Sequence, residues 1–310
     1  MKYLIFAILL SLMTPSAKAA QCDTVALTIT TPSYSLNSNP NPVLSFTVKV
    51  TEKTGKNDCI YFVTFNQGSA PDYNRKLYNG LASVPIQLYN TPPSTYVLQD
   101  YPTLVSANNA IVGTLKSTSN GGKTNTHTYA TTFSIPPANT LWGTYQNTFA
   151  VKLYTGTVTG SHTLVSTKTV TYTYTIAKVI NLALVTEGAP FDVFATTYNM
   201  DFGNMSTGQT KGFDAVIVSN AGYQLSFSSQ NNGRLKHSTR NSYVNYSVTV
   251  NTTPYSLVGS STLPVIVATG TGATSSQGAR ANTKVILGTV ATQLAGIYMD
   301  TVTISVATTN

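Results

Sequence analysis

The stretch that decides the fold is "LAGIYMDTVTISVATTN" (Leu294–Asn310). Val302, Ile304 and Val306 alternate with threonine and serine, and this period of two predicts a β-strand with one apolar face. A similar stretch, "LWGTYQNTFAVKLY", begins at Leu141, and enough sequence follows it for one more strand. The two stretches therefore differ in what comes after them.

Alternating segments of the same kind recur along the whole chain. Among them are "LSFTVKV", "YFVTF", "TVTYTYTI", "INLALV", "YQLSF" and "YVNYSVTV", and turn-forming stretches such as "NSNPNP" and "TSNGG" separate them. Threonine, valine and tyrosine favour strands, and helical periodicity is missing almost everywhere. The sequence therefore predicts an all-β protein built from two immunoglobulin-like antiparallel β-sandwiches in tandem.

Residues 1–20 are expected to be a secretory signal peptide. Lys2 precedes an apolar run that is too short to span a bilayer, and Ala17 and Ala19 fit a small-x-small cleavage site. Cys22 raises the alternative of a lipoprotein, although a glutamine precedes it where such sites have a small residue. We expect Cys22 and Cys59 to form a disulfide in an oxidising compartment.

Composition argues against several classes of function. The formal charge is +8, but only 9% of the residues are charged and the basic ones are scattered, so no nucleic-acid partner is expected. The ten acidic residues are dispersed, and no G-x-S-x-G or H-E-x-x-H motif occurs. His127, His162 and His237 have no evident acid partner. The sequence therefore predicts no enzyme, no catalytic residue, no metal site and no cofactor.

The two halves of the chain resemble each other. An offset of 153 (294 − 141) superposes Leu141 on Leu294 and Tyr145 on Tyr298, and "YFVTF" matches "YQLSF" at an offset of 162 (223 − 61). A diverged duplication is the economical interpretation, and chance similarity between two threonine-rich β-sequences is the alternative. The boundary is expected near 177–179, which gives an N-terminal domain 21–177 and a C-terminal domain 178–310.

The repeat predicts that the C-terminal domain lacks its last strand. After Tyr154 the first copy continues through a turn and a further strand to Ile176, whereas three residues follow the equivalent Ala307. An incomplete sandwich leaves unpaired backbone groups along an edge and apolar side chains in contact with water. A strand from another chain would repair both faults by β-augmentation. The predicted acceptor groove consists of Leu182, Leu184, Phe213, Ile217, Tyr223, Leu225, Phe227, Tyr298, Val302, Ile304 and Val306.

The second half, with "MDFGNMSTGQTKGFDAVIVSNAGYQLSFSSQNNGRLKHS" and "AGIYMDTVTISV", resembles the pilin domain of bacterial chaperone–usher fibres. It is most similar to the archaic branch, whose subunits carry the spore coat U domain, and the likeness covers roughly 179–310. One departure is that this half has no cysteine, and Ala221 stands where Cys59 does in the repeat. A two-domain subunit of this family with a C-terminal pilin domain resembles a tip adhesin.

The resemblance implies a set of partners and a location. It implies a periplasmic pilus chaperone, an outer-membrane usher and an adjacent pilin subunit as strand donor. It also implies export through the periplasm to the pilus tip, with a role in adhesion and biofilm formation. A mature chain that begins near Cys22 has no extension to donate, which favours the end of a fibre. A structural coat or fibre-shaft protein and a lectin-like sugar-binding tip are the alternatives.

The N-terminal domain is expected to attach to a host or abiotic surface through a proline-stiffened segment with much apolar surface. The predicted surface-binding residues are Tyr96, Leu98, Tyr101, Leu104, Val105, Ile111, Val112 and Trp142. The alternative for the first seven is that they belong to the core of a strand that the pattern does not reveal. Trp142 would stack on a sugar ring if exposed, and a packed structural role is the alternative.

Overall fold

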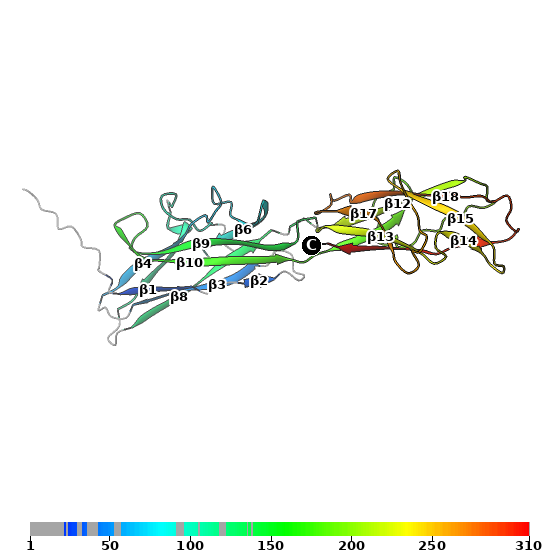
Figure 1. The fold of residues 1–310 in the computed structure, drawn as a ribbon. Coiled ribbons are helices and arrows are strands. Elements are labelled where there is room, and N and C mark those ends of the chain that lie inside the picture. The colour runs from blue at the N-terminus through cyan, green and yellow to red at the C-terminus, as the bar shows by residue number, and fades with distance from the viewer. Residues whose placement is uncertain are drawn as a thin grey trace, which may run out of the picture.

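The computed structural model describes residues 22, 24–29, 33–35, 43–52, 57–90, 96–104, 106–117, 122–134, 136–137 and 139–309. Figure 1 shows two β-sandwiches arranged end to end, with the C-terminus at the junction between them. The predicted fold class, all-β with tandem immunoglobulin-like sandwiches, is confirmed. The predicted signal peptide lies outside the described residues.

The described residues of the first sandwich form ten strands and a short 3₁₀ helix. One layer has the order β1-β3-β8-β6, and the other has the order β7-β4-β9-β10-β2, with β5 joining β6 to β9. All pairs are antiparallel except β10 with β2, which are parallel. The elements are β1 Val25–Ile29, β2 Ser33–Ser35, β3 Val43–Glu52, β4 Cys59–Phe65, β5 Lys76–Asn79, β6 Ala82–Tyr89, η1 Ala107–Asn109, β7 Ile111–Leu115, β8 Lys123–Phe133, β9 Gly143–Gly156 and β10 His162–Ile176.

The second sandwich repeats this plan with fewer strands in one layer. Its larger sheet has the order β11-β12-β18-β15-β14-β19, with β16 beside β15, and its smaller sheet has the order β17-β13-β20. The strands are β11 Ile180–Val185, β12 Thr210–Ser219, β13 Tyr223–Ser229, β14 Arg234–His237, β15 Tyr243–Val250, β16 Thr253–Tyr255, β17 Val265–Gly270, β18 Ala279–Leu287, β19 Tyr298–Met299 and β20 Val302–Thr308.

The strand registers confirm the internal repeat. In the first sandwich Phe62 of β4 lies opposite Tyr154 of β9, and in the second Gln224 of β13 lies opposite Ala307 of β20. The two sequence offsets map the first pair onto the second. The copies therefore share their ladder geometry as well as their sequence pattern.

The turn before each terminal strand is also repeated. Tyr145 donates from its hydroxyl to the backbone oxygen of Leu141, and Tyr298 does the same to Leu294. The glycine two residues before each tyrosine has a positive φ, 126° at Gly143 and 153° in the second copy, a conformation that favours glycine. This corner resembles the tyrosine corner of immunoglobulin-like sandwiches and lies where β9 and β19 begin.

The two tyrosines give a matched test of the corner. Tyr145→Phe removes a hydrogen bond from a completely buried side chain and leaves the Leu141 carbonyl without this donor, so we expect the first sandwich to lose about 1–2 kcal/mol of unfolding free energy. Tyr298→Phe should cost the second sandwich less, because Tyr298 is partly exposed and water can replace its hydroxyl. Denaturant unfolding of both variants measures the difference, and equal costs would contradict it.

Candidate functional site: an open strand edge

β20 is paired along one edge only. Its ladder with β13 runs from the Ser229–Val302 pair to the Tyr223–Thr308 pair, and among the described residues no strand pairs with its other edge. Its counterpart β9 pairs with β4 on one edge and with β10 on the other, from Gly143 to Gly156. The first sandwich is therefore closed by its own chain at the position where the second is open.

The side chains on this edge differ in burial between the copies. Three inward residues of β9 are completely buried, namely Phe149, Val151 and Leu153. Their counterparts at the same offset pack against the core of the second sandwich but stay partly exposed, namely Val302, Ile304 and Val306. The same positions of the repeat are thus covered in the first sandwich and partly exposed in the second. The first sandwich has β10 beside them, and the described residues of the second have no such strand.

The opposite wall of this opening shows the same contrast. Val25 and Leu27 of β1 are buried, whereas their counterparts on β11, Ile180 and Leu182, are only partly buried. β11 lies against β20 without pairing with it. Two strands of the second sandwich therefore approach each other without sharing backbone hydrogen bonds among the described residues.

The segment 197–202 follows β11 and completes that wall. Tyr198, Met200 and Phe202 are partly buried and alternate with exposed residues, as in a strand, but no described strand pairs with this segment. The Tyr198 ring stacks on Phe213, with 5.3 Å between centroids. In the first sandwich the corresponding strand after β1 is β2, which pairs with β10. We call the position between β20 and 197–202, which β10 occupies in the first copy, the slot.

Most of the predicted groove residues lie together in one apolar cluster. Of the predicted residues, those buried in the cluster are Phe213, Ile217, Tyr223, Leu225 and Phe227, and those partly buried against it are Leu182, Leu184, Val302, Ile304 and Val306. The prediction for Tyr298 is wrong. Its ring meets His237 edge-on, with 5.0 Å between centroids, because Tyr298 lies in β19, which pairs with β14 in the other sheet.

Asp300 turns the chain from β19 into β20, and the sequence did not reveal this role. Its carboxylate accepts hydrogen bonds from the hydroxyls of Ser229 and Tyr246, each at 2.6 Å, and from the backbone N–H of Asn231 at 3.0 Å. Burial, followed by the Asp300 contact, raises the pKa of Tyr246. Asn147 accepts from the next residue's N–H in the first copy as Asp300 does here, but Asn147 lies inside the continuous strand β9, so the turn belongs to the second copy.

Asn220, in the turn between β12 and β13, ties the two sandwiches together. Its side chain accepts from the Val179 N–H at 2.7 Å and donates to the Ala177 carbonyl at 2.8 Å. Its backbone carbonyl accepts from the Trp142 N–H at 3.0 Å, and the Lys178 ammonium lies 4.2 Å from the centre of the Trp142 ring. These contacts support the packed structural role that the sequence offered as the alternative for Trp142.

Three other predicted surface residues belong to the interior, namely Leu98, Leu104 and Ile111. For Leu98 the physical reason is a buried cation. The guanidinium of Arg75, which is 1% exposed, donates to the backbone carbonyls of Phe65 and Leu98 and thereby holds the loop against the sheet. Burial lowers the pKa of Arg75 to about 10. Attachment through these three leucine and isoleucine side chains is therefore excluded.

Asp100 anchors the same loop from the other side. It is 3% exposed, accepts from the Thr64 hydroxyl at 2.8 Å and forms an ion pair with Lys152 at 2.7 Å. Tyr101, the next residue, is partly buried, and its ring stacks on His162 with 4.7 Å between centroids. Of the remaining predicted residues, Tyr96 and Val112 are exposed, and Val105 lies outside the described residues.

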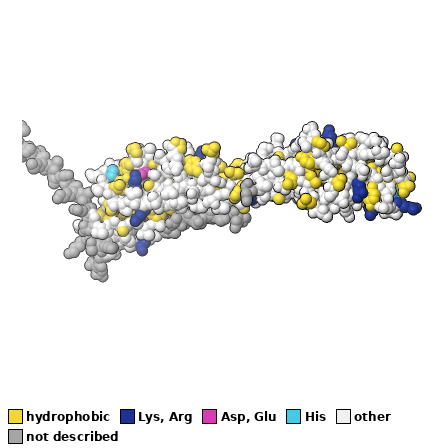
Figure 2. Space-filling model, viewed as in Figure 1, with side chains coloured by type: hydrophobic (Ala, Val, Ile, Leu, Met, Phe, Trp, Pro, Cys, Tyr) yellow, Lys and Arg dark blue, Asp and Glu magenta, His cyan; other side chains and the backbone are white. Residues whose placement is uncertain are grey.

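An apolar row crosses the outer face of the sheet that contains β4, and its two central members, Phe62 and Tyr154, are buried in a cluster with Leu104 and Val158. Phe62 lies opposite Val112 on one side and Tyr154 on the other, and Tyr154 lies opposite Leu164. The two outer members of this row are half exposed, Val112 at 50% and Leu164 at 48%, and Ile60 beside them is 47% exposed. We call Ile60, Val112 and Leu164 the outer-face patch. Figure 2 shows hydrophobic side chains on the visible surface of both sandwiches.

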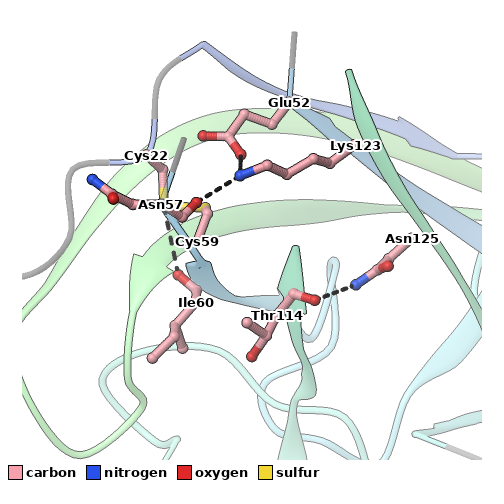
Figure 3. Close-up of a disulfide and its surroundings, with 8 residues drawn as sticks. All are labelled: Cys22, Glu52, Asn57, Cys59, Ile60, Thr114, Lys123 and Asn125. Carbon is pink, nitrogen blue, oxygen red and sulfur yellow. Dashed lines mark hydrogen bonds and ion pairs between the residues drawn. A yellow bond between two sulfur atoms is a disulfide. The ribbon is translucent and has the colours of Figure 1, made fainter. Parts of the chain in front are cut away.

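The predicted disulfide between Cys22 and Cys59 is confirmed, with a Cα–Cα distance of 5.2 Å. Figure 3 shows it beside a buried ion pair that the sequence did not predict. The Lys123 ammonium lies 3.2 Å from the Glu52 carboxylate and donates to the Asn57 carbonyl at 2.6 Å. These contacts join β3 and β8 to the loop before β4 at the end of the first sandwich that lies away from the second.

A shallow cavity of about 450 Å³ opens between β7 and β8 in the first sandwich. It is lined by Asn90, Asn108, Thr126, Thr128, His127 and the apolar residues Ala110 to Val112. The Tyr61 hydroxyl lies 2.5 Å from the His127 ring, and burial lowers the pKa of His127. None of the described residues that line this cavity carries a charged side chain.

Two further searches cover the described residues only. No group of three or more histidine, cysteine, aspartate or glutamate residues is arranged there to hold a metal ion. No helix there is long and apolar enough to cross a membrane.

Comparison with family models and with curated proteins finds no match. Similar solved structures include a chain of the CsuC–CsuE chaperone–tip adhesion subunit complex from the archaic chaperone–usher Csu pili of Acinetobacter baumannii, at 13% identity, 91% coverage of this chain, 99% of the other and a TM-score of 0.41. They also include the CupB6 tip adhesin of Pseudomonas aeruginosa, at 10% identity, 90% and 93% coverage and a TM-score of 0.43.

A third similar structure is the CssB subunit of enterotoxigenic Escherichia coli colonization factor CS6, complemented with a donor strand from CssA. It is 16% identical, covers 49% of this chain and 97% of its own, and has a TM-score of 0.27. The structural neighbours are thus chaperone–usher tip adhesins and pilins, the family that the sequence resembles.

The junction gives a testable consequence. Asn220→Ala removes two hydrogen bonds from a residue that is 2% exposed, so we expect a loss of about 2 kcal/mol in unfolding free energy and a wider spread of angles between the sandwiches. Denaturant unfolding and small-angle X-ray scattering measure the two effects. Asn241→Ala, at an exposed position, is the control, and an equally small effect of both variants would contradict the role of Asn220.

Proposed function

We propose that this chain is an adhesive subunit of a cell-surface fibre, and that its second sandwich accepts a strand from another protein chain into the slot. The observation that carries the proposal is the difference between the two copies at one position. β10 covers β9 in the first sandwich, while the outer edge of β20 has no partner strand among the described residues of the second.

The energetics favour occupation of the slot. Full burial of a valine or isoleucine side chain contributes roughly 1.5–3 kcal/mol relative to exposure, and Val302, Ile304 and Val306 are only partly buried. Covering these side chains therefore stabilises the second sandwich by an amount comparable to a large part of a domain's net stability. A strand that also pairs with the backbone of β20 adds hydrogen bonds along the same edge.

The partners follow from this chemistry and from the family resemblance. A periplasmic pilus chaperone covers the slot first, an outer-membrane usher exports the complex, and an adjacent pilin subunit then supplies the strand. The first sandwich, which its own chain closes, attaches to a host or abiotic surface at the pilus tip and supports adhesion and biofilm formation. The chain has no catalytic role in this proposal.

A graft built from the protein itself tests the slot. Replacing Thr308–Asn310 with a copy of Thr155–Ile176 places a β10-like strand after Ala307 in the register of the repeat. We expect the second sandwich to gain about 3 kcal/mol in unfolding free energy, because the copied strand covers Ile304 and its neighbours. Denaturant unfolding measures the gain, and slower amide hydrogen exchange in β20 locates it.

The control is the same graft with serine at the three positions that are buried in the original strand, namely Val170, Tyr172 and Tyr174. A second graft with valine at the two tyrosine positions tests strands with smaller inward side chains. The proposal that the slot accepts a strand is contradicted if neither apolar graft stabilises the second sandwich or protects β20 more than the serine control does.

Attachment is proposed to occur through the outer-face patch. Replacing Ile60, Val112 and Leu164 with serine removes three exposed apolar side chains without touching the core, so binding of the protein to polystyrene should fall at least tenfold. The control replaces Val193, Val258 and Leu263, exposed residues of the second sandwich, with serine. Equal loss of binding in the two triple variants would contradict attachment through the patch.

A further inference from the structure

Three large apolar side chains are exposed at the end of the second sandwich that lies away from the first. They are Leu294, Ile297 and Met299, at 55%, 67% and 59% exposure. Met299 lies opposite Lys236 in the β14–β19 pair, and the Ile297 carbonyl accepts from the N–H of the residue after β14. The three apolar side chains therefore lie beside a basic strand, and Figure 2 shows Lys and Arg side chains at this end.

Lys236 and Arg240 complete this surface with positive charge. Both are exposed, and neither forms any of the ion pairs recorded among the described residues. We call Lys236, Arg240, Leu294, Ile297 and Met299 the far-end face. Its apolar centre favours burial, and its unpaired cations favour an acidic partner.

The internal repeat shows what such a surface does in the first copy. Residues 294–299 correspond to 141–146, and both segments have the same tyrosine-to-leucine hydrogen bond and positive-φ glycine. In the first copy this segment contacts the next sandwich through two interactions. The Trp142 N–H donates to Asn220, and the Trp142 ring lies against Lys178. The same part of the fold is thus a docking surface in one copy and exposed in the other.

The direction of the strand in the slot also places its exit at the far-end face. β10 leaves the first sandwich where Ile176 pairs with Gly143, and the chain then enters the second sandwich through 177–179. A strand that lies antiparallel to β20 in the slot leaves the second sandwich near Gly296, the counterpart of Gly143. The other end of the slot is next to the first sandwich, where Lys178 donates to the Thr309 carbonyl.

We propose that the far-end face docks the folded body of the chain whose strand fills the slot. That body is a β-sandwich with an acidic, partly apolar surface, and it stacks on the second sandwich as the second stacks on the first. This inference rests on the proposed function and adds to it the position and the surface chemistry of the partner.

Photo-cross-linking of the full chain, assembled by the cell that makes it, tests the docking. A benzophenone side chain replaces Thr303, which is exposed on β20 beside the slot, or Ile297 in the far-end face. The control position is Leu81, which is fully exposed in the first sandwich. Mass spectrometry identifies the cross-linked peptides from each position.

We expect positions 303 and 297 to cross-link the same foreign polypeptide, the first through an extended segment and the second through an acidic surface of the domain that follows it. Replacing Lys236 and Arg240 with glutamate should lower the cross-link yield at 297 at least fivefold, while the yield at 303 persists. The same replacement at Lys211 and Lys284, two exposed lysines of the second sandwich, should lower neither.

Each other outcome has a definite meaning. A cross-link at 303 without one at 297 overturns the docking face and leaves the strand-acceptor function standing. A cross-link at 297 to a second copy of this chain, or equal effects of the two charge reversals, also overturns it. The absence of a cross-link to another chain at both positions overturns the proposed function itself.

Discussion

The second sandwich depends on one constraint, which is that a strand edge must be paired and its apolar side chains must be covered. β9 and β20 are the same strand in two copies, yet only β9 has a neighbour on both edges. That one difference accounts for the partial exposure of Ile304 on β20 and of Leu182 on β11, the strand that forms the opposite wall. It also explains why the segment 197–202 alternates like a strand and has no strand partner in the described chain.

Local pattern predicted most of the fold. The period of two located the strands, and the two offsets map the observed pair Phe62–Tyr154 onto the observed pair Gln224–Ala307. Adjacent residues carry this information, because side-chain direction and backbone pairing are coupled along a strand. Tyr298 was wrongly assigned to the acceptor groove because the chain turns at Asp300 from one sheet into the other. A single polar residue in an apolar pattern does not indicate such a turn.

The prediction that the loop of the first sandwich exposes its apolar side chains was the larger error. It failed because contacts between residues far apart in the sequence hold this loop against the sheet. Leu98 is buried because Arg75 donates to its carbonyl, and the next turn is held because Asp100 binds Thr64 and Lys152. These partners are far apart in sequence, so periodicity does not connect them. A buried arginine and a buried aspartate are costly unless their hydrogen bonds are satisfied, which explains why they fix the loop so firmly.

The length of the β9–β10 pair has a mechanical consequence. Its ladder runs from Gly143 to Gly156 along the long axis of the molecule, and β10 leads directly into the second sandwich at Ile176. When the molecule is pulled by its two ends, tension acts parallel to these strands, and their hydrogen bonds bear the load together in shear instead of opening one after another. The first sandwich should therefore withstand greater traction than a hairpin that is pulled apart from its open end.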